Sequence, residues 1–362
     1  MSVAGEASPA TPFGDRLAAA VEGRRSQVVL GLDPDPARLW PEPVDAAELR
    51  AELAAALAMA ERAAVRLRLA SRGVAAAGGE QARPVPGGTA GDAASRTDAG
   101  DPAPRLMAAA DVLAHCIAVI DAAGSACVAV KPQLACFERL GFAGWLALEQ
   151  TCEHARRQGL LVLADGKRGD VPVTAAAYAQ ALLGDTPSPY GPARGLRADA
   201  VTANPLLGGD ALAPLIAGAR ATGAGVFALV RTSNPGAADV LDLPLADGRP
   251  LWERLAAAVH HAGAPGAASG LSDVGAVCGA TEPAHLLRMR ELMPHTPFLL
   301  PGVGAQGGEV ATLAAAAKPG RAAALVTASR SIVDAYRTAG GDPAAAALAE
   351  AERLRAAAWA LG

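Results

Sequence analysis

Short apolar segments alternate along the chain with longer Ala/Leu-rich stretches of helical character. This alternation is typical of βαβ units, in which parallel strands are connected by helices. Because eight strand-then-helix units fit a closed barrel better than an open sheet, the pattern predicts an α/β fold, a (β/α)8 TIM barrel. The predicted strands are 27–32, 126–131, 160–165, 198–203, 225–231, 274–278, 298–302 and 322–327.

The segment 71–104 does not follow this pattern. It is rich in Ala, Gly and Pro, and its only larger apolar residues are Val74 and Val85. Such a segment cannot bury enough apolar surface to offset the entropy lost when a chain becomes ordered. We therefore expect a single barrel domain over residues 13–362, preceded by a flexible N-terminus (1–12) and interrupted by a disordered insertion between strands 1 and 2.

Composition narrows the class of protein. Aromatic residues make up only 3 % of the chain, so its large core must be aliphatic. A net charge of −4 without a basic stripe gives no electrostatic footprint for nucleic acid. The five cysteines show no CxxC spacing, the N-terminus has no signal-peptide core, and no uninterrupted apolar run approaches membrane length. These features predict a cytoplasmic protein that binds neither nucleic acid nor membrane.

Charged residues collect where the predicted strands end, which in a barrel of parallel strands is the face that carries the chemistry. The third strand leads into Asp165-Gly166-Lys167-Arg168-Gly169-Asp170, and Lys131 ends the strand before it. Because side chains alternate along a strand, Asp165 and Lys167 point to the same side. Taken singly, Asp170 would be a helix N-cap and Lys167 a solvated lysine. Two lysines and two aspartates converging on one point, however, are not needed for core packing.

Such an array has a chemical use. The carboxylates favour the protonated form of both lysines. A fixed ammonium can stabilise a carbanion that develops beside it and can then deliver the proton as a general acid. The array therefore suits a reaction that creates a carbanion, and we expect neither a metal site nor a cofactor.

Two further loops are candidates for substrate binding. The glycine-rich loop 301–308, which contains Gly304 and Gln306, follows the seventh strand, and Arg330 follows the eighth. Barrels often bind phosphate with these two loops, although a glycine loop alone is an ordinary turn. After the fifth strand, Ser233 lies in Thr232-Ser233-Asn234-Pro235-Gly236, where a hydroxyl can read a base edge and the long loop to about Arg249 can act as a lid. Asn-Pro-Gly is also a common turn.

Together these motifs resemble those of the bacterial type 2 orotidine 5′-phosphate decarboxylases. The resemblance runs from Phe13 to Ile332 apart from the insertion, and its anchors occur in order, strand by strand. The anchors are Gly31-Leu32-Asp33-Pro34, Val130-Lys131-Pro132-Gln133, the Asp165–Asp170 segment, Asn204-Pro205-Leu206-Leu207-Gly208, the Ser233 loop, Gly279-Ala280-Thr281 and Pro301-Gly302-Val303-Gly304-Ala305-Gln306-Gly307-Gly308. Two departures are modest: Val171 stands where the family often has Ile, and the insertion is longer than expected.

The resemblance implies cofactor-free decarboxylation of orotidine 5′-monophosphate (OMP) to uridine 5′-monophosphate (UMP) in pyrimidine biosynthesis. It implies that Lys167 protonates C6 of the pyrimidine, that Asp165 lies beside the leaving carboxylate, and that Lys131 and Asp170 complete the charged network. It further implies a homodimer with shared active sites. The implied substrate-binding residues are Asp33 with Lys131 for the ribose, Ser233 for the pyrimidine, Gln306, Gly304 and Arg330 for the phosphate, and Thr174, which with Asp170 reaches the neighbouring subunit's site.

Three other interpretations compete with this one. A magnesium-dependent sugar-phosphate decarboxylase or aldolase of the same barrel type would need additional carboxylates, and no Glu lies near Asp33, Lys131 and Asp165 at the strand ends. A catalytically inactive barrel that serves as a binding module should have lost at least one of the four charged positions, and none is lost. A Schiff-base role for Lys167 is disfavoured, because nearby aspartates keep the amine protonated and poorly nucleophilic.

Overall fold

The computed structural model describes residues 10–41, 103–279, 283–302 and 310–362, together with the single residues Ala51, Ala55 and Met59. Most of the N-terminus and of the insertion that were predicted to be flexible, namely residues 1–9 and 71–102, lies outside the described residues. The predicted phosphate-loop residues Gly304 and Gln306 also lie outside them.

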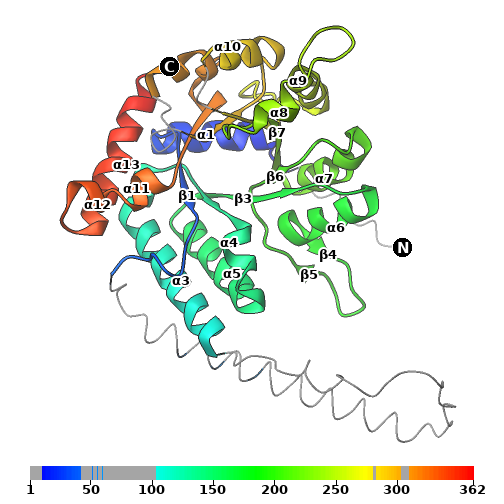
Figure 1. Cartoon of the computed structure of the whole chain (residues 1–362). Coiled ribbons are helices and arrows are strands. Elements are labelled where there is room, and N and C mark those ends of the chain that lie inside the picture. Colours follow the sequence, from blue (N-terminus) through cyan, green and yellow to red (C-terminus); the bar gives the residue numbers. More distant parts are fainter. Residues whose placement is uncertain are drawn as a thin grey trace, which may run out of the picture.

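Eight parallel strands close into a barrel in the order β1-β10-β9-β8-β7-β6-β3-β2, and helices surround them (Figure 1). The predicted (β/α)8 barrel is therefore confirmed. The strands are β1 (Val28–Leu32), β2 (Ala129–Pro132), β3 (Leu161–Arg168), β6 (Ala200–Ala203), β7 (Gly225–Arg231), β8 (Val274–Cys278), β9 (Phe298–Leu300) and β10 (Ala324–Ala328).

The strand boundaries differ most from the prediction at β2, which starts three residues later than predicted, and at β3, which ends three residues later. The predicted strand ended at residue 165, whereas β3 extends to Arg168 because this residue pairs with Ala203 after a shift in register. Two short strands, β4 (Asp185–Thr186) and β5 (Ala193–Arg194), were not predicted and form an antiparallel hairpin. They carry too few residues to show a strand-like pattern of apolar positions.

Helices follow the strands around the barrel, as expected for βαβ units. The α-helices are α1 (Phe13–Arg24), α3 (Ala103–Ala123), α4 (Leu134–Glu138), α5 (Gly141–Arg157), α6 (Pro172–Leu183), α7 (Gly209–Thr222), α8 (Ala237–Leu241), α9 (Leu251–Ala262), α10 (Pro283–Leu292), α11 (Arg330–Val333), α12 (Tyr336–Ala339) and α13 (Pro343–Trp359). The described ranges also contain three 3-10 helices: η1 (Gly124–Ala126), η2 (Val310–Ala317) and η3 (Arg321–Ala323).

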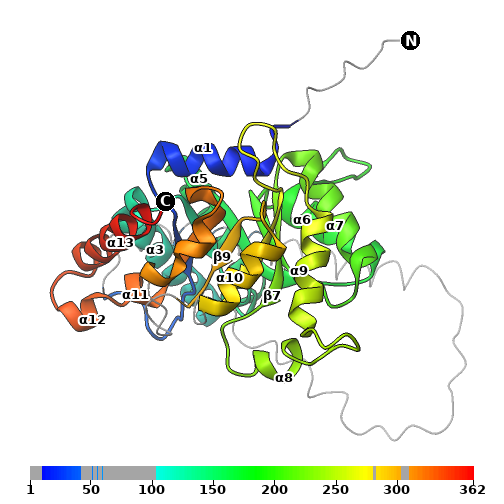
Figure 2. The same cartoon turned by 90° about the horizontal axis from the view of Figure 1, so that it is seen from above.

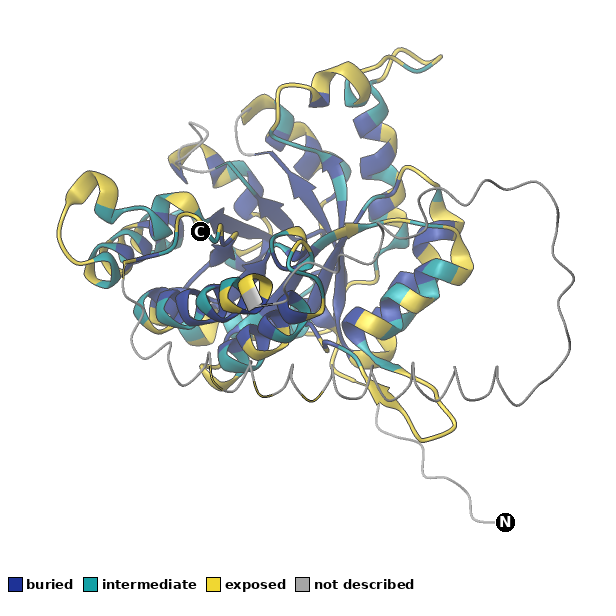
Figure 3. Cartoon of the chain, turned by 60° about the horizontal axis from the view of Figure 1, so that its bottom comes forward, coloured by how far each residue is buried: buried dark blue, intermediate teal, exposed yellow. Residues whose placement is uncertain are grey.

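The core has two parts, one between the strands and the outer helices and one inside the barrel. The barrel strands are mostly buried, whereas the helices expose their outer faces (Figure 3). Helix α1 contributes Phe13, Leu17 and Val21 to the interior cluster, and the ring of Phe13 meets Phe227 of β7 edge to face with 5.9 Å between centroids. In Figure 2, α1 lies on one side of the barrel and α8 on the opposite side. Helix α1 therefore closes the end of the barrel that faces away from the carboxyl ends of the strands.

One segment of the described chain, Pro104–Ala126, is long and apolar enough to cross a membrane. Most of it is buried inside the fold, because α3 packs against α5 and α13. Burial against neighbouring helices accounts for its apolar character, as in the core helix of a barrel.

Candidate active site

A charged cluster lies at the carboxyl ends of β2 and β3. Lys131 of β2 donates to Asp165 of β3, with 2.5 Å between Nζ and Oδ2. Lys167 donates to the other carboxylate oxygen, with 2.7 Å between Nζ and Oδ1. Asp165 and Lys131 are buried, whereas the Lys167 side chain is 43 % exposed and so reaches the mouth of the barrel. The structure thus brings three of the four predicted charged residues together around one buried carboxylate.

The two lysines determine the ionisation of Asp165. Burial alone would raise the pKa of this carboxyl, but the charges and hydrogen bonds of Lys131 and Lys167 outweigh burial and lower the pKa to about 2. For Lys131, burial favours the neutral amine, while the negative charges of Asp165 and Asp33 outweigh it and raise the pKa. Asp165 is therefore a carboxylate and Lys131 an ammonium at neutral pH.

The backbone of Lys167 has an uncommon conformation. Its φ is +47°, in the left-handed region that residues with a Cβ rarely adopt. The β3–β6 ladder shifts its register here: four steps along β3, from Ala164 to Arg168, face two steps along β6. Bulges of this kind re-aim side chains and are frequent beside active sites. The bulge presents the ammonium of Lys167 to Asp165 at the mouth.

Asp170, the fourth predicted charged residue, does not join this cluster within the described chain. No ion pair within 4.0 Å connects it to either lysine, and its Oδ1 accepts a hydrogen bond from the backbone N–H of Val171, 2.7 Å away. Thr174, in the first turn of α6, is also partly exposed. Their implied roles in a neighbouring subunit's site remain predictions.

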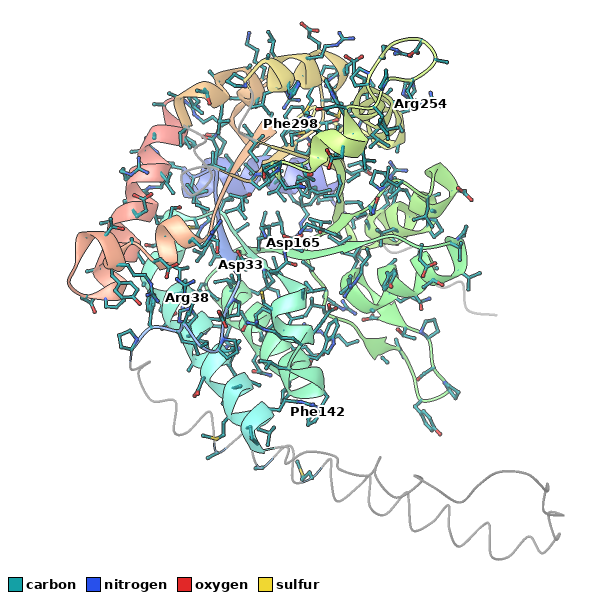
Figure 4. The ribbon with its side chains drawn as sticks, in the orientation of Figure 1. Asp33, Arg38, Phe142, Asp165, Arg254 and Phe298 are labelled. Atoms are coloured by element: carbon teal, nitrogen blue, oxygen red, sulfur yellow. The ribbon has the colours of Figure 1, made fainter. Side chains whose placement is uncertain are left out.

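The loop after β1 and the start of α11 enclose a pocket of about 270 Å³. Asp33 and Arg330 both line it, so the predicted ribose and phosphate residues face a common space. Gly31 makes this approach possible, because a Cβ there would lie 2.6 Å from the Cβ of Ser329. Asp33 and Asp165 both act on the charge of Lys131, and in the view of Figure 4 both lie near the centre of the barrel, with Arg38, which also lines the pocket, further out.

Trp40 anchors this loop to the helices beside it. Its Nε1 donates to the carbonyl of Val333 at the end of α11 (2.8 Å), and its backbone N–H donates to Nδ1 of His115 on α3 (3.2 Å). Burial lowers the pKa of His115 to about 4, so the imidazole is neutral at pH 7. Neutral His115 is therefore a fixed support for the loop.

The loop after β7 carries Ser233, and two contacts hold its base. Gly279 lies directly beneath Ser233, since a Cβ on this glycine would meet the Ser233 Cα at 2.9 Å. Arg231 at the end of β7 forms a two-point ion pair with Asp242 just after α8, with 2.8 Å for each N–O contact. The hydroxyl is therefore held on a fixed section of chain rather than on the open part of the loop.

Sequence reasoning missed three residues at this site: Thr202, Gln133 and Arg38. Thr202 and Gln133 both donate to Asp165, but a single hydroxyl or amide at a strand end gives no signal by itself. The two lysines that were predicted, by contrast, also stand out by composition, because the whole sequence has only Lys131, Lys167 and Lys318. A chain that otherwise uses arginine places two of its lysines here, and lysine, unlike arginine, can release a proton.

Within the described ranges, no three His, Cys, Asp or Glu side chains come together as a metal-binding group. A closed barrel of eight parallel strands with buried, alternating charges at its carboxyl ends defines the class of (β/α)8-barrel enzymes. Residues 104–349 match the family described as "Orotidine 5'-phosphate decarboxylase / HUMPS family". The chain belongs to this family.

Individual relatives agree with the family match. An orotidine 5′-phosphate decarboxylase of Deinococcus radiodurans is 43 % identical over 244 residues, which is 66 % of this chain and 83 % of the relative. One of Roseiflexus sp. is 40 % identical over 262 residues, covering 70 % and 88 % respectively. The solved structure of Leishmania donovani OMP decarboxylase has a TM-score of 0.60 at 27 % identity and covers 96 % of this chain and 99 % of that one.

Proposed function

We propose that this protein is a carboxy-lyase that converts OMP to UMP and CO2 without a cofactor, the decarboxylation step of pyrimidine biosynthesis. The observation that carries the proposal is the Lys131–Asp165–Lys167 array, in which one buried carboxylate lies between two ammonium groups. The names of the relatives support the same reaction. The assignment to the type 2 subgroup stays a prediction.

In the proposed reaction, the bond between C6 and the substrate carboxylate breaks and its electron pair stays on C6. The Lys167 ammonium stabilises this charge electrostatically and then transfers its proton to C6, so UMP and CO2 leave and Lys167 is a neutral amine until solvent reprotonates it. Asp165 lies beside the leaving carboxylate. Repulsion between the two negative charges raises the free energy of the bound substrate more than that of the transition state. Lys131 holds that charge in place, as its 2.5 Å contact with Asp165 suggests.

The remaining predicted residues bind the substrate. Asp33, together with Lys131, hydrogen-bonds the ribose hydroxyls, and Ser233 contacts the pyrimidine. Arg330 grips the 5′-phosphate with the loop that contains Gly304 and Gln306. The pocket shared by Asp33 and Arg330 supports this arrangement, because the ribose and the phosphate are adjacent in the substrate.

The active enzyme is a homodimer in which Asp170 and Thr174 complete the site of the neighbouring subunit. Two observations favour this. Asp170 makes no ion pair with the lysines of its own chain. Next to it, Val171 and Val173 are 55 % and 84 % exposed. Leu206 and Leu207, which follow the Asn204 that lies against Gly169, are also about half exposed. Exposed apolar side chains that cluster around a charged residue are typical of an interface.

A spectrophotometric assay of OMP consumption by the purified protein tests the proposal. We expect full activity in EDTA without added metal, flavin or pyridoxal phosphate, because the charged array takes the place of an electron sink. Activity that disappears in EDTA and returns with magnesium would favour the sugar-phosphate decarboxylase or aldolase alternative. We further expect the reaction in the cytoplasmic fraction.

A further inference from the structure

Thr202 of β6 connects the two residues on which the proposed reaction depends. It is 1 % exposed, and its hydroxyl lies 2.8 Å from Oδ1 of Asp165. The same hydroxyl lies 2.9 Å from the backbone nitrogen of Lys167. One buried side chain thus contacts the carboxylate through one hydrogen bond and the backbone that carries the ammonium through another.

The direction of each hydrogen bond follows from the groups involved. The backbone N–H of Lys167 can only donate, so the Thr202 oxygen accepts from it. Asp165, with a pKa of about 2, is ionised and can only accept, so the hydroxyl proton points to Oδ1. The hydroxyl thus donates to Asp165 and accepts from the Lys167 backbone, and it holds both groups in place.

The bulge in β3 explains why these contacts are needed. Where four steps of β3 face two of β6, the N–H of Lys167 does not join the regular ladder. A partly buried N–H without a partner is costly, and the left-handed backbone of Lys167 adds strain. The hydroxyl of Thr202 takes the place of the missing ladder acceptor and stabilises the conformation that aims the Lys167 ammonium at Asp165.

We propose that Thr202 is a positioning residue for the decarboxylation: its hydroxyl fixes Asp165 and Lys167 relative to each other. This rests on the proposed function, since it assumes the roles given to those two residues. Thr202 would act through these two residues, whose contacts it makes. Its loss should therefore lower kcat while leaving KM for OMP and the affinity for UMP nearly unchanged.

The test compares Thr202→Val, which keeps the shape and removes the hydroxyl, with Thr202→Ser, which keeps the hydroxyl. We expect kcat to fall about tenfold to a hundredfold for Val and to return to within about threefold of wild type for Ser, as expected for one misaligned preorganised charge. The Lys167 amide should exchange with deuterium faster in the Val variant and at the wild-type rate in Ser. If Val prevents folding, Thr202→Ala removes the same hydroxyl without adding bulk.

Thr327→Val is the matched control. Thr327 of β10 is also buried and, like Leu325 two residues earlier, faces the barrel interior, but its hydroxyl has no hydrogen-bond partner among the described residues. We expect its kcat to stay near wild type. Equal losses for Thr202→Val and Thr327→Val, an unchanged kcat in Thr202→Val, or a Ser variant as slow as Val would each overturn the proposal. Wild-type protein that does not decarboxylate OMP would instead overturn the proposed function.

Discussion

The Nζ of Lys131 lies 2.5 Å from Oδ2 of Asp165, and less than a tenth of either side chain is exposed to solvent. Each charge is buried only because the other is present, since an unpaired ion in this environment would lose its hydration without compensation. The pair therefore belongs to the stability of the fold as well as to the proposed chemistry.

Acid should weaken the fold through Asp165. Its pKa of about 2 in the folded protein lies below the ordinary value of 3.8, so the ionised group contributes about 2 kcal/mol of stability above pH 4. This contribution is lost as the pH falls from about 4 toward 2. The gap in unfolding free energy between wild type and Asp165→Asn should therefore shift by about 2 kcal/mol, in favour of the variant, between pH 5 and pH 2. Denaturant titrations measure it, with Asp210→Asn, which removes an exposed carboxylate, as control.

Replacement of Lys167 should abolish decarboxylation without unfolding the protein. The C6 carbanion has no ring position that delocalises it, so losing the fixed cation should cost at least a hundredfold to a thousandfold in rate, and more because the proton donor is lost too. Lys167→Ala should still bind UMP. Lys167→Arg should also be nearly inactive, because arginine keeps the charge but does not release a proton. Lys318→Ala, an exposed lysine outside the site, should behave as wild type; an active Lys167→Arg would refute proton donation by Lys167.

Arg330→Ala should strongly weaken the binding of OMP yet barely change the turnover of orotidine, which has no phosphate. Binding energy from a remote phosphate is commonly used to organise a reacting site. Only the phosphorylated substrate should therefore lose binding energy when Arg330 is replaced. Steady-state kinetics with both substrates measure the difference. Arg353→Ala on α13 removes the same charge away from the pocket and should leave both substrates unaffected. Equal losses for the two substrates in Arg330→Ala would contradict a phosphate role.

Asp170→Ala and Lys167→Ala subunits, each inactive alone, should regain activity when mixed. If Asp170 acts across the dimer, one site of the hybrid carries both substitutions and the other carries neither. The recovered activity should approach a quarter of the wild-type value when subunits exchange at random, because about half of the dimers are hybrids with one intact site. A mixture that exchanges subunits and stays inactive would show that Asp170 acts within its own barrel.

Asp242→Ala should raise KM for OMP by about tenfold with a smaller effect on kcat. The two-point pair with Arg231 fixes the loop that carries Ser233, so its loss should cost ordering free energy during substrate binding. Asp239→Ala, which removes an exposed carboxylate from α8 of the same loop, is the control. An unchanged KM in Asp242→Ala would mean that Gly279 and the strand end suffice to hold Ser233.

The sequence by itself determined the barrel and the position of its chemistry. Strand and helix periodicities are local, so eight strands could be located from apolar segments alone, and β7 and β8 match the predicted bounds residue for residue. Because all eight strands are parallel, the residues at their carboxyl ends had to meet at one face. This is why Lys131, Asp165 and Lys167 could be grouped from the order of the motifs, although Asp170, which was grouped with them, makes no ion pair with either lysine.

Only the tertiary structure decided how these residues meet. The bulge in β3 depends on the register between β3 and β6, which lie more than thirty residues apart, so neither the left-handed Lys167 nor the bridging Thr202 could be seen in a local pattern. The same holds for Trp40, whose partners His115 and Val333 are brought to it by closure of the barrel. Periodicity determines which side of a strand a side chain faces, whereas pairing between distant strands determines which residues that side chain contacts.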